Sequence, residues 1–185
     1  MQSKPILVSI FFSSIILFLS LVSVDTYNIL PIKTTYSALT TEAQKQVTCL
    51  AENIYFEAGH EPIDGQKAVA FVTLNRVQSG YADDICGVVK QKTGNQCQFS
   101  WYCDETFTSR RLTIKHTSLY NDILELSTNI FLNFDKMKDV TNGATYYHAD
   151  YVKPGWTKLK KEIQIGRHIF YKSKKDSIDR NKGII

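Results

Sequence analysis

One glutamate of this chain, Glu57, has the sequence surroundings that a general acid needs. It follows Tyr55 and Phe56 in a segment with helical periodicity, and Gly59 interrupts that segment soon afterwards. Aromatic neighbours keep water away from a carboxyl group, and desolvation raises the pKa of an acid. A carboxyl group that keeps its proton near neutral pH can donate it to a reacting atom. Glu57 is therefore predicted to be a catalytic proton donor.

The helix that carries Glu57 is expected to begin at Thr41, because Thr41 and Gln44 have the spacing of a capping box. Its apolar residues recur at intervals of three and four, at Val47, Leu50, Ala51, Ile54 and Ala58. With about 100° of rotation per residue, Glu57 lies about 60° from Ile54, at the margin of the apolar face. Gly59 is expected to end the helix. A side chain at that margin can be partly dry and still reach substrate.

Changes in the spacing of apolar residues predict the elements that come after this helix in the chain. They are a helix over 65–79 capped by Asp64 and closed by Gly80, a helix over 111–134, and short strands over 144–148 and 162–171, the second broken near Gly166. The second helix is apolar nearly all round, so we expect it to be buried. Helices followed by a small sheet predict an α+β domain.

Three ordered blocks of residues resemble a known family. They are Tyr55, Glu57, Ala58, Glu61, Gly65 and Gln66 followed by Asn75, Arg76 and Val77; then Gln98, Phe99, Ser100 and Trp101; then Gly143, Ala144, Thr145, Tyr147, His148, Pro154, Trp156, Ile165, Gly166, His168, Phe170 and Tyr171. The pattern resembles the cell-wall hydrolase family of spore-cortex-lytic enzymes (SleB/CwlJ type). One departure is that the family usually has Arg-Gly after the Glu-Ala pair, whereas this chain has Gly59 and His60.

The resemblance implies a lysozyme-like domain with a helical lobe, a small β-rich lobe and a cleft between them. It also implies cleavage of peptidoglycan between N-acetylmuramic acid and N-acetylglucosamine. Most glycosidases pair an acid with a second carboxylate, for which Glu61 is the nearest candidate. The family resembles lytic transglycosylases, in which one glutamate is acid and then base, so Glu61 would position the turn or bind sugar. A hydrolytic muramidase, an amidase and a non-catalytic peptidoglycan-binding protein are the alternatives.

Further substrate contacts are predicted in the second and third blocks. Gln98 places an amide beside the rings of Phe99 and Trp101, and rings stack on sugars while amides bond their hydroxyl groups. Tyr147 and His148 are expected to bind substrate or to steady the acid. A packing role in the core is the alternative for both sets.

Other chemistries find little support in the sequence. His148, Asp150 and His168 suggest a metal site, but the resemblance accounts for both histidines without one. We expect no metal and no cofactor. The chain has no phosphate-binding Gly-Lys-Ser/Thr loop and no Gly-x-Ser-x-Gly elbow, so neither nucleotide chemistry nor a serine hydrolase is indicated.

The N-terminus indicates export. Residues 5–24 are uncharged and mostly apolar and follow Lys4, so 1–24 is predicted to be a cleaved signal peptide or a transmembrane signal anchor. Residues 25–39 have no periodicity and are interpreted as a linker. The catalytic domain is expected over 40–172 and a basic tail over 173–185. The protein would then act in the periplasm or cell envelope.

The four cysteines fit that compartment. Cys49, Cys86, Cys97 and Cys103 all lie in the part that would be exported, and an even number there favours disulfide bonds over zinc. Three pairings are possible. A bridge between Cys97 and Cys103 would stiffen the loop that carries Gln98 and Trp101.

Charge is unevenly distributed along the chain. Residues 1–152 carry 12 Lys and Arg against 15 Asp and Glu, whereas 153–185 carry 10 against 3. Outside the cytoplasmic membrane, a basic C-terminal region would favour anionic envelope polymers or the membrane surface. A merely solvated tail is the alternative. We expect no nucleic acid as a partner.

Overall fold

The computed structural model describes residues 35–176, 178 and 184. The predicted signal or anchor segment and most of the predicted linker lie outside these residues. Among the described helices, none combines the length and apolar character that crossing a membrane requires. All described elements belong to one compact unit, residues 34–185.

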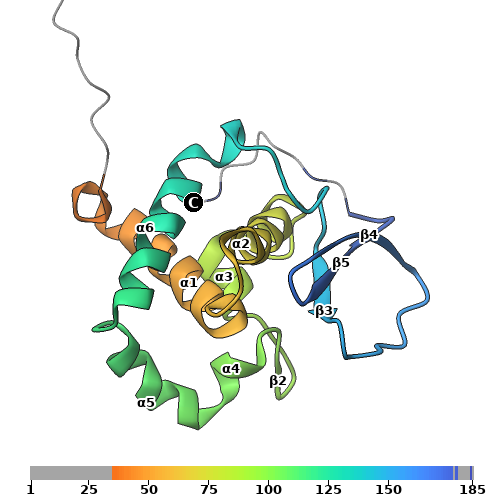
Figure 1. Cartoon of the computed structure of the whole chain (residues 1–185), viewed down its shortest axis with the longest axis horizontal. Helices are drawn as coiled ribbons and strands as arrows, with labels where there is room; N and C mark the ends of the chain where they lie inside the picture. Colours follow the sequence, from red (N-terminus) through yellow and green to blue (C-terminus); the bar gives the residue numbers. More distant parts are fainter. Residues whose placement is uncertain (1–34, 177, 179–183, 185) are drawn as a thin grey trace, which may run out of the picture. The chain divides into compact units, whose positions relative to one another are not determined.

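The first part of this unit is helical (Figure 1). It contains α1 (Thr41–Ala58), α2 (Ile63–Gln78), α3 (Ile85–Val89), α4 (Ser100–Cys103), α5 (Glu105–Ile114) and α6 (Ser118–Asn133), with 3-10 turns η2 (Tyr36–Ala38) and η3 (Phe134–Lys136). The large core consists of the apolar face of α1 against α2, α3 and α6. The predicted face of α1 is confirmed, because all five of its apolar residues are buried.

The predicted caps of α1 and α2 are wrong by one or two positions. Thr40, whose backbone is extended, caps α1 by accepting a hydrogen bond from the Ala43 N–H at 3.3 Å, so Thr41 is the first helical residue and not the cap. Pro62 precedes α2, and Asp64 lies inside its first turn, where it pairs with Lys67. Helix α2 is buried on nearly every side, as predicted.

The helix predicted over 111–134 is two helices, α5 and α6. The backbone at Thr117 is extended, and its Oγ1 accepts from the Tyr120 N–H at 3.2 Å to begin α6. A residue with a good capping side chain thus stops one helix and starts the next. An apolar stripe along one helix over 111–134 would bury Leu112, but Leu112 is 72% exposed in α5.

Both pairs of cysteines are bonded. Cys49 of α1 joins Cys86 of α3, and Cys97 joins Cys103 at the end of α4, which confirms the prediction of disulfides. Cys97 lies in a short hairpin of β1 (Lys92–Thr93) and β2 (Gln96–Cys97). The Gln98 segment is therefore enclosed by a covalent loop.

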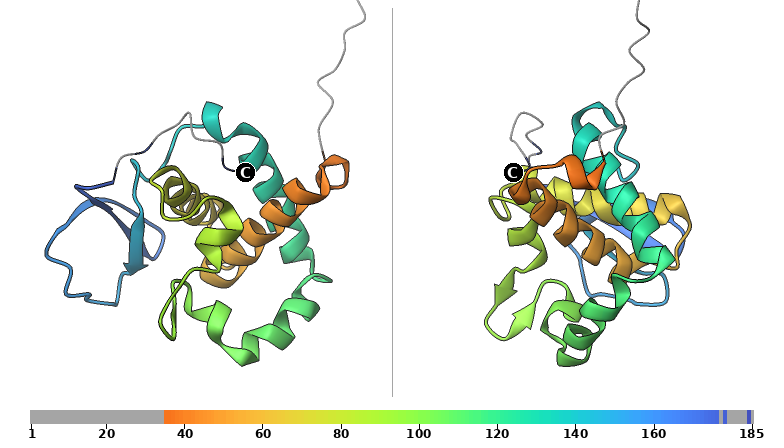
Figure 2. Two further views of the ribbon diagram at one scale, coloured as in Figure 1. Left: turned by 180° about the vertical axis from the view of Figure 1, so that it is seen from behind. Right: turned by 90° about the vertical axis from the view of Figure 1, so that its left-hand side faces the viewer.

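The second part is a three-stranded antiparallel sheet in the order β3-β5-β4. Its strands are β3 (Tyr146–Ala149), β4 (Leu159–Ile165) and β5 (His168–Ser173). The segment predicted as one broken strand is a hairpin, whose turn contains Gly166 at φ +55°. Ala68 and Val72 of α2 form a second, small core with Ala144 and Phe170. Helix α2 thus lies between the other helices and the sheet (Figure 2), and the α+β prediction is confirmed.

Candidate active site

Glu57 lies in the last turn of α1, and its side chain is half-buried. The helix ends where predicted, with the Gly59 N–H donating to the Tyr55 carbonyl at 3.1 Å. Gly59 has φ −57°, so its backbone keeps the right-handed helical conformation at the residue that caps the C-terminal end of α1. The side chain of Gln66 then holds the turn, because its Nε2 donates to the carbonyls of Gly59 at 3.3 Å and Glu61 at 3.1 Å.

The carboxyl group of Glu57 is bonded to the sheet. Tyr147 of β3 donates a hydrogen bond from its phenol to Oε2 of Glu57 at 2.9 Å. Burial raises the pKa of Glu57 above its ordinary value, while the Tyr147 hydrogen bond and the charge of Arg76 oppose that rise. Burial also raises the pKa of Tyr147, which keeps its phenol protonated and able to donate. Glu57 therefore holds a proton more tightly than an exposed glutamate does.

Arg76 of α2 also belongs to this site, a role that was not predicted from the sequence. Its side chain is 3% exposed, and its Nε donates to the Thr145 carbonyl at 2.6 Å. Its guanidinium lies 5.2 Å from the ring centre of Phe99 and 5.8 Å from that of Tyr146. Among the described residues, its buried Nη1 has no hydrogen-bond partner. An arginine inside an otherwise apolar helix was the available signal, since a buried charge needs a reason.

Glu61 binds the turn of the sheet hairpin. Its Oε2 accepts from the Arg167 N–H at 3.1 Å. Gly166 passes so close that a Cβ atom there would collide with the Glu61 carboxylate. This geometry matches the positioning role that the sequence left open for Glu61. Substrate binding by Glu61 remains a prediction.

The structure separates Tyr147 from His148. Tyr147 packs beside His168 and Phe170, with ring centres 5.3 Å and 5.7 Å away. His148 instead stacks on Tyr171 at 5.2 Å and bonds its hydroxyl through Nε2 at 3.0 Å. Neighbouring residues of a strand point to opposite faces of the sheet. Tyr147 consequently meets Glu57, and His148 does not.

The second predicted block is divided between surface and core. Gln98 is exposed, but Phe99 and Trp101 are 4% and 3% exposed. Trp101 stacks on Phe56 with ring centres 4.7 Å apart, and its Nε1 donates to Asn53 Oδ1 at 3.0 Å. Protein atoms cover the two rings that were predicted to stack on sugar. Phe99 and Trp101 are thus packed in the core, and sugar binding by them stays a prediction.

His168 is another titratable group beside this site, next to Tyr147. Its ring is 9% exposed, and burial lowers its pKa, which favours the neutral form. Within the part of the chain that the structure describes, no three His, Cys, Asp or Glu side chains are grouped as metal ligands would be. His148, Asp150 and His168, which the sequence analysis raised and set aside, are not such a group.

Comparison with known proteins gives the family. The model of the cell wall hydrolase family matches residues 60–171, and the chain belongs to this family, of the SleB/CwlJ type. The matched range begins just after Glu57. A spore cortex-lytic enzyme of Halalkalibacterium halodurans is 30% identical over 131 residues, which are 69% of this chain and 35% of that protein. One from Oceanobacillus iheyensis is 29% identical over 134 residues, 70% of this chain and 42% of that protein.

A solved structure is also similar. The catalytic domain of the Bacillus cereus SleB protein has 25% sequence identity and a TM-score of 0.50, over 70% of this chain and 91% of that domain. The chain thus covers most of a catalytic domain, but less than half the length of the curated relatives that it matches.

Proposed function

We propose that this chain is an exported enzyme that cleaves peptidoglycan between N-acetylmuramic acid and N-acetylglucosamine. Membership of the cell wall hydrolase family supports the substrate class. The observation that carries the chemistry is Glu57, a half-buried carboxyl group with a raised pKa that Tyr147 bonds through one oxygen. Two disulfide bonds support export, because such bonds persist in oxidising compartments.

The proposed reaction is lytic transglycosylation with Glu57 as the only acid and base. Protonated Glu57 donates its proton to the glycosidic oxygen of the leaving sugar. The resulting carboxylate then accepts a proton from the 6-hydroxyl of muramic acid as that oxygen attacks the anomeric carbon. The glycosidic bond is replaced by a 1,6-anhydro bond, and no water is consumed.

The surroundings of Glu57 suit both halves of this cycle. Burial favours the protonated carboxyl group before transfer. After transfer, the hydrogen bond from Tyr147 and the charge of Arg76 stabilise the carboxylate. Because Tyr147 bonds Oε2, the proton would be exchanged through Oε1.

This route needs only one carboxylate as acid and base, so Glu61 is left for a positioning role. Its carboxylate is bonded to the Arg167 N–H and holds the hairpin turn. We propose that Glu61 positions the β4–β5 turn at the edge of the site. The exposed amide of Gln98 remains the candidate for a sugar hydroxyl contact.

The products test the proposal. The full chain is incubated with purified peptidoglycan, and released fragments are identified by mass spectrometry. We expect 1,6-anhydromuramic acid ends. Reducing muramic acid ends would indicate a hydrolytic muramidase, free stem peptides an amidase, and binding without release a non-catalytic protein. Each of these three results would contradict transglycosylation.

A further inference from the structure

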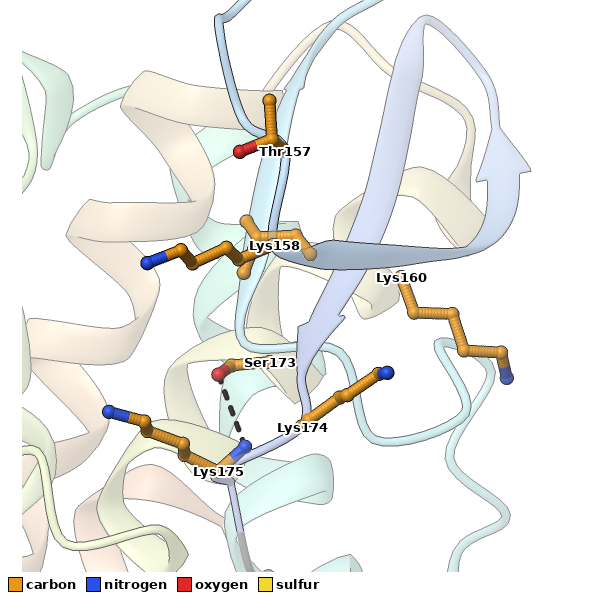
Figure 3. A pocket seen from close by; sticks show the side chains of 7 residues that line it. Thr157, Lys158, Lys160, Ser173, Lys174 and Lys175 are labelled. Atoms are coloured by element: carbon orange, nitrogen blue, oxygen red, sulfur yellow. Dashed lines mark hydrogen bonds between the residues drawn. The ribbon is translucent and has the colours of Figure 1, made fainter.

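A lysine-lined hollow lies on the sheet where β4 begins and β5 ends (Figure 3). Its volume is about 690 Å³, and it is lined by Thr157, Lys158, Leu159, Lys160, Ser173, Lys174 and Lys175. The lining includes four lysines and no acid, so the hollow has a strongly positive potential. Such a surface attracts anions from solution.

Little of this charge is compensated by the protein. Lys160 pairs with Glu162 at 3.0 Å. Among the described residues, Lys158, Lys174 and Lys175 have no carboxylate within ion-pair distance. Within the part of the chain that the structure describes, the charges of these three ammonium groups are therefore uncompensated.

The acids next to this hollow are already engaged. A smaller hollow of about 380 Å³ adjoins it and includes Glu162 and Asp176 in its lining. Glu162 forms the pair with Lys160, and Asp176 accepts from the Tyr81 hydroxyl and the Ser173 N–H, both at 3.1 Å. Both acids line that smaller hollow together with Lys174, but neither forms an ion pair with it among the described residues.

The strand register adds repulsion at this end of the hairpin. Leu159 pairs with Ser173, and Lys160 lies directly opposite Lys172. Like charges directly opposite each other on neighbouring strands destabilise a sheet. A bound anion would offset the repulsion between the two ammonium groups, whereas water and mobile salt ions only screen it.

The hollow lies at the end of the hairpin that is away from the Glu61 contact. The turn of the same hairpin, at Gly166, is the end that contacts Glu61. Strand β4 spans Leu159–Ile165, and a strand rises about 3.3 Å per residue, so the lysines lie about 20 Å from that turn. An anion bound there would not contact Glu61 or the hairpin turn.

We propose that this hollow binds phosphate groups of a phosphodiester polymer of the cell envelope. Ammonium groups bind phosphate oxygens as point charges. In Figure 3, Lys158 and Lys175 point to one side of the hairpin, while Lys160 and Lys174 point to the other. A flexible chain can contact both sides, whereas a flat bilayer contacts only one. Binding would hold the enzyme beside its wall substrate and raise the local concentration of glycan.

The test measures binding of the full chain to poly(glycerol phosphate) of defined length as a function of salt. The test variant is Lys158→Gln, Lys174→Gln and Lys175→Gln together. The control variant, Lys90→Gln, Lys138→Gln and Lys153→Gln, removes the same charge from exposed lysines elsewhere. All six side chains are exposed, so both variants are expected to fold.

We expect the test variant to lose at least tenfold in affinity at low salt. The slope of log affinity against log salt should decrease by about 2, since each lost phosphate contact removes about 0.7 on a single chain. The control should change less than twofold. Equal losses in both variants would show a general charge effect and overturn the proposal.

Two further probes separate the sources of phosphate. Inorganic phosphate should compete only at much higher concentration than the polymer, because it offers one contact at a time. Phosphatidylglycerol vesicles should bind wild type and test variant alike. Selective loss of vesicle binding, with polymer binding unchanged, would assign the hollow to a membrane surface and overturn the proposal.

Discussion

The phenol of Tyr147 donates a 2.9 Å hydrogen bond to Oε2 of Glu57, joining two residues 90 positions apart in the chain. This contact connects the end of α1 to β3, and so the helices to the sheet. It also occupies one oxygen of the carboxyl group and leaves the other for the proposed proton transfer. The position of the proposed acid is therefore determined by the sheet as well as by its own helix.

Glu57→Gln should lower peptidoglycan cleavage by about two orders of magnitude or more, because the amide cannot transfer a proton. Folding and wall binding should persist, as the side chain keeps its size. Fragment release is measured by chromatography and folding by circular dichroism. Glu42→Gln, at the exposed start of the same helix, is the control and should behave as wild type. Near wild-type cleavage by the Glu57 variant would show that the acid lies elsewhere.

The same substitution should change stability with pH. Burial raises the pKa of Glu57 in the folded state, so its contribution to stability is fully present below the unfolded pKa. That contribution is lost as pH rises through the folded pKa. Glu57→Gln should thus be more stable than wild type above that pKa, and the advantage should vanish in acid. Urea unfolding across this pH range measures the difference, and a constant difference would contradict the raised pKa.

Tyr147→Phe should shift the pH profile upward. The Tyr147 hydrogen bond lowers the pKa of Glu57, so its removal raises that pKa further. If Glu57 is the acid, as proposed, activity falls as pH rises through its pKa, and the alkaline limb of the pH profile should move to higher pH. The maximal rate should fall about tenfold or more, since a hydrogen bond to the carboxylate contributes about 1.5–3 kcal/mol. An unchanged alkaline limb of the pH profile would show that Tyr147 has only a packing role and does not affect the pKa of Glu57.

Glu61→Gln should reduce cleavage less than Glu57→Gln, because the amide oxygen can still accept from the Arg167 N–H. Gly166→Ala should be more damaging, since a Cβ there collides with the Glu61 carboxylate at a positive φ. We expect it to lose stability by about 1–3 kcal/mol and to lose activity with it. Urea unfolding and fragment release measure both variants. A folded Glu61→Gln protein without activity would make Glu61 the acid.

The two disulfide bonds should contribute unequally to stability. Their cysteines are separated by 37 positions in the Cys49–Cys86 pair and by 6 in the Cys97–Cys103 pair. In the chain-entropy model the longer loop stabilises by about 1.5 kcal/mol more. Urea unfolding of the two double alanine variants compares them, and thiol titration of unfolded wild type should find no free thiol. Equal losses would mean that strain or packing outweighs loop entropy.

Local patterns in the sequence predicted much of the helical part. The spacing of apolar residues determined the buried face of α1 and placed Glu57 at its margin, because 3.6 residues per turn is a property of the helix alone. The apolar character of α2 determined its burial in the same way. An even number of cysteines in a segment predicted to be exported indicated disulfides, but their pairing depended on the position of α3 against α1.

Tertiary packing decided which residues surround Glu57. Strand alternation places Tyr147 and His148 on opposite faces, but only the packing of the sheet against α2 determines that Tyr147 faces the acid. Burial of Phe99 and Trp101, and of Arg76 between Phe99 and Tyr146, likewise required contacts between distant segments. A sequence pattern records the period of one element, whereas desolvation and hydrogen bonding of a side chain depend on every element that packs around it.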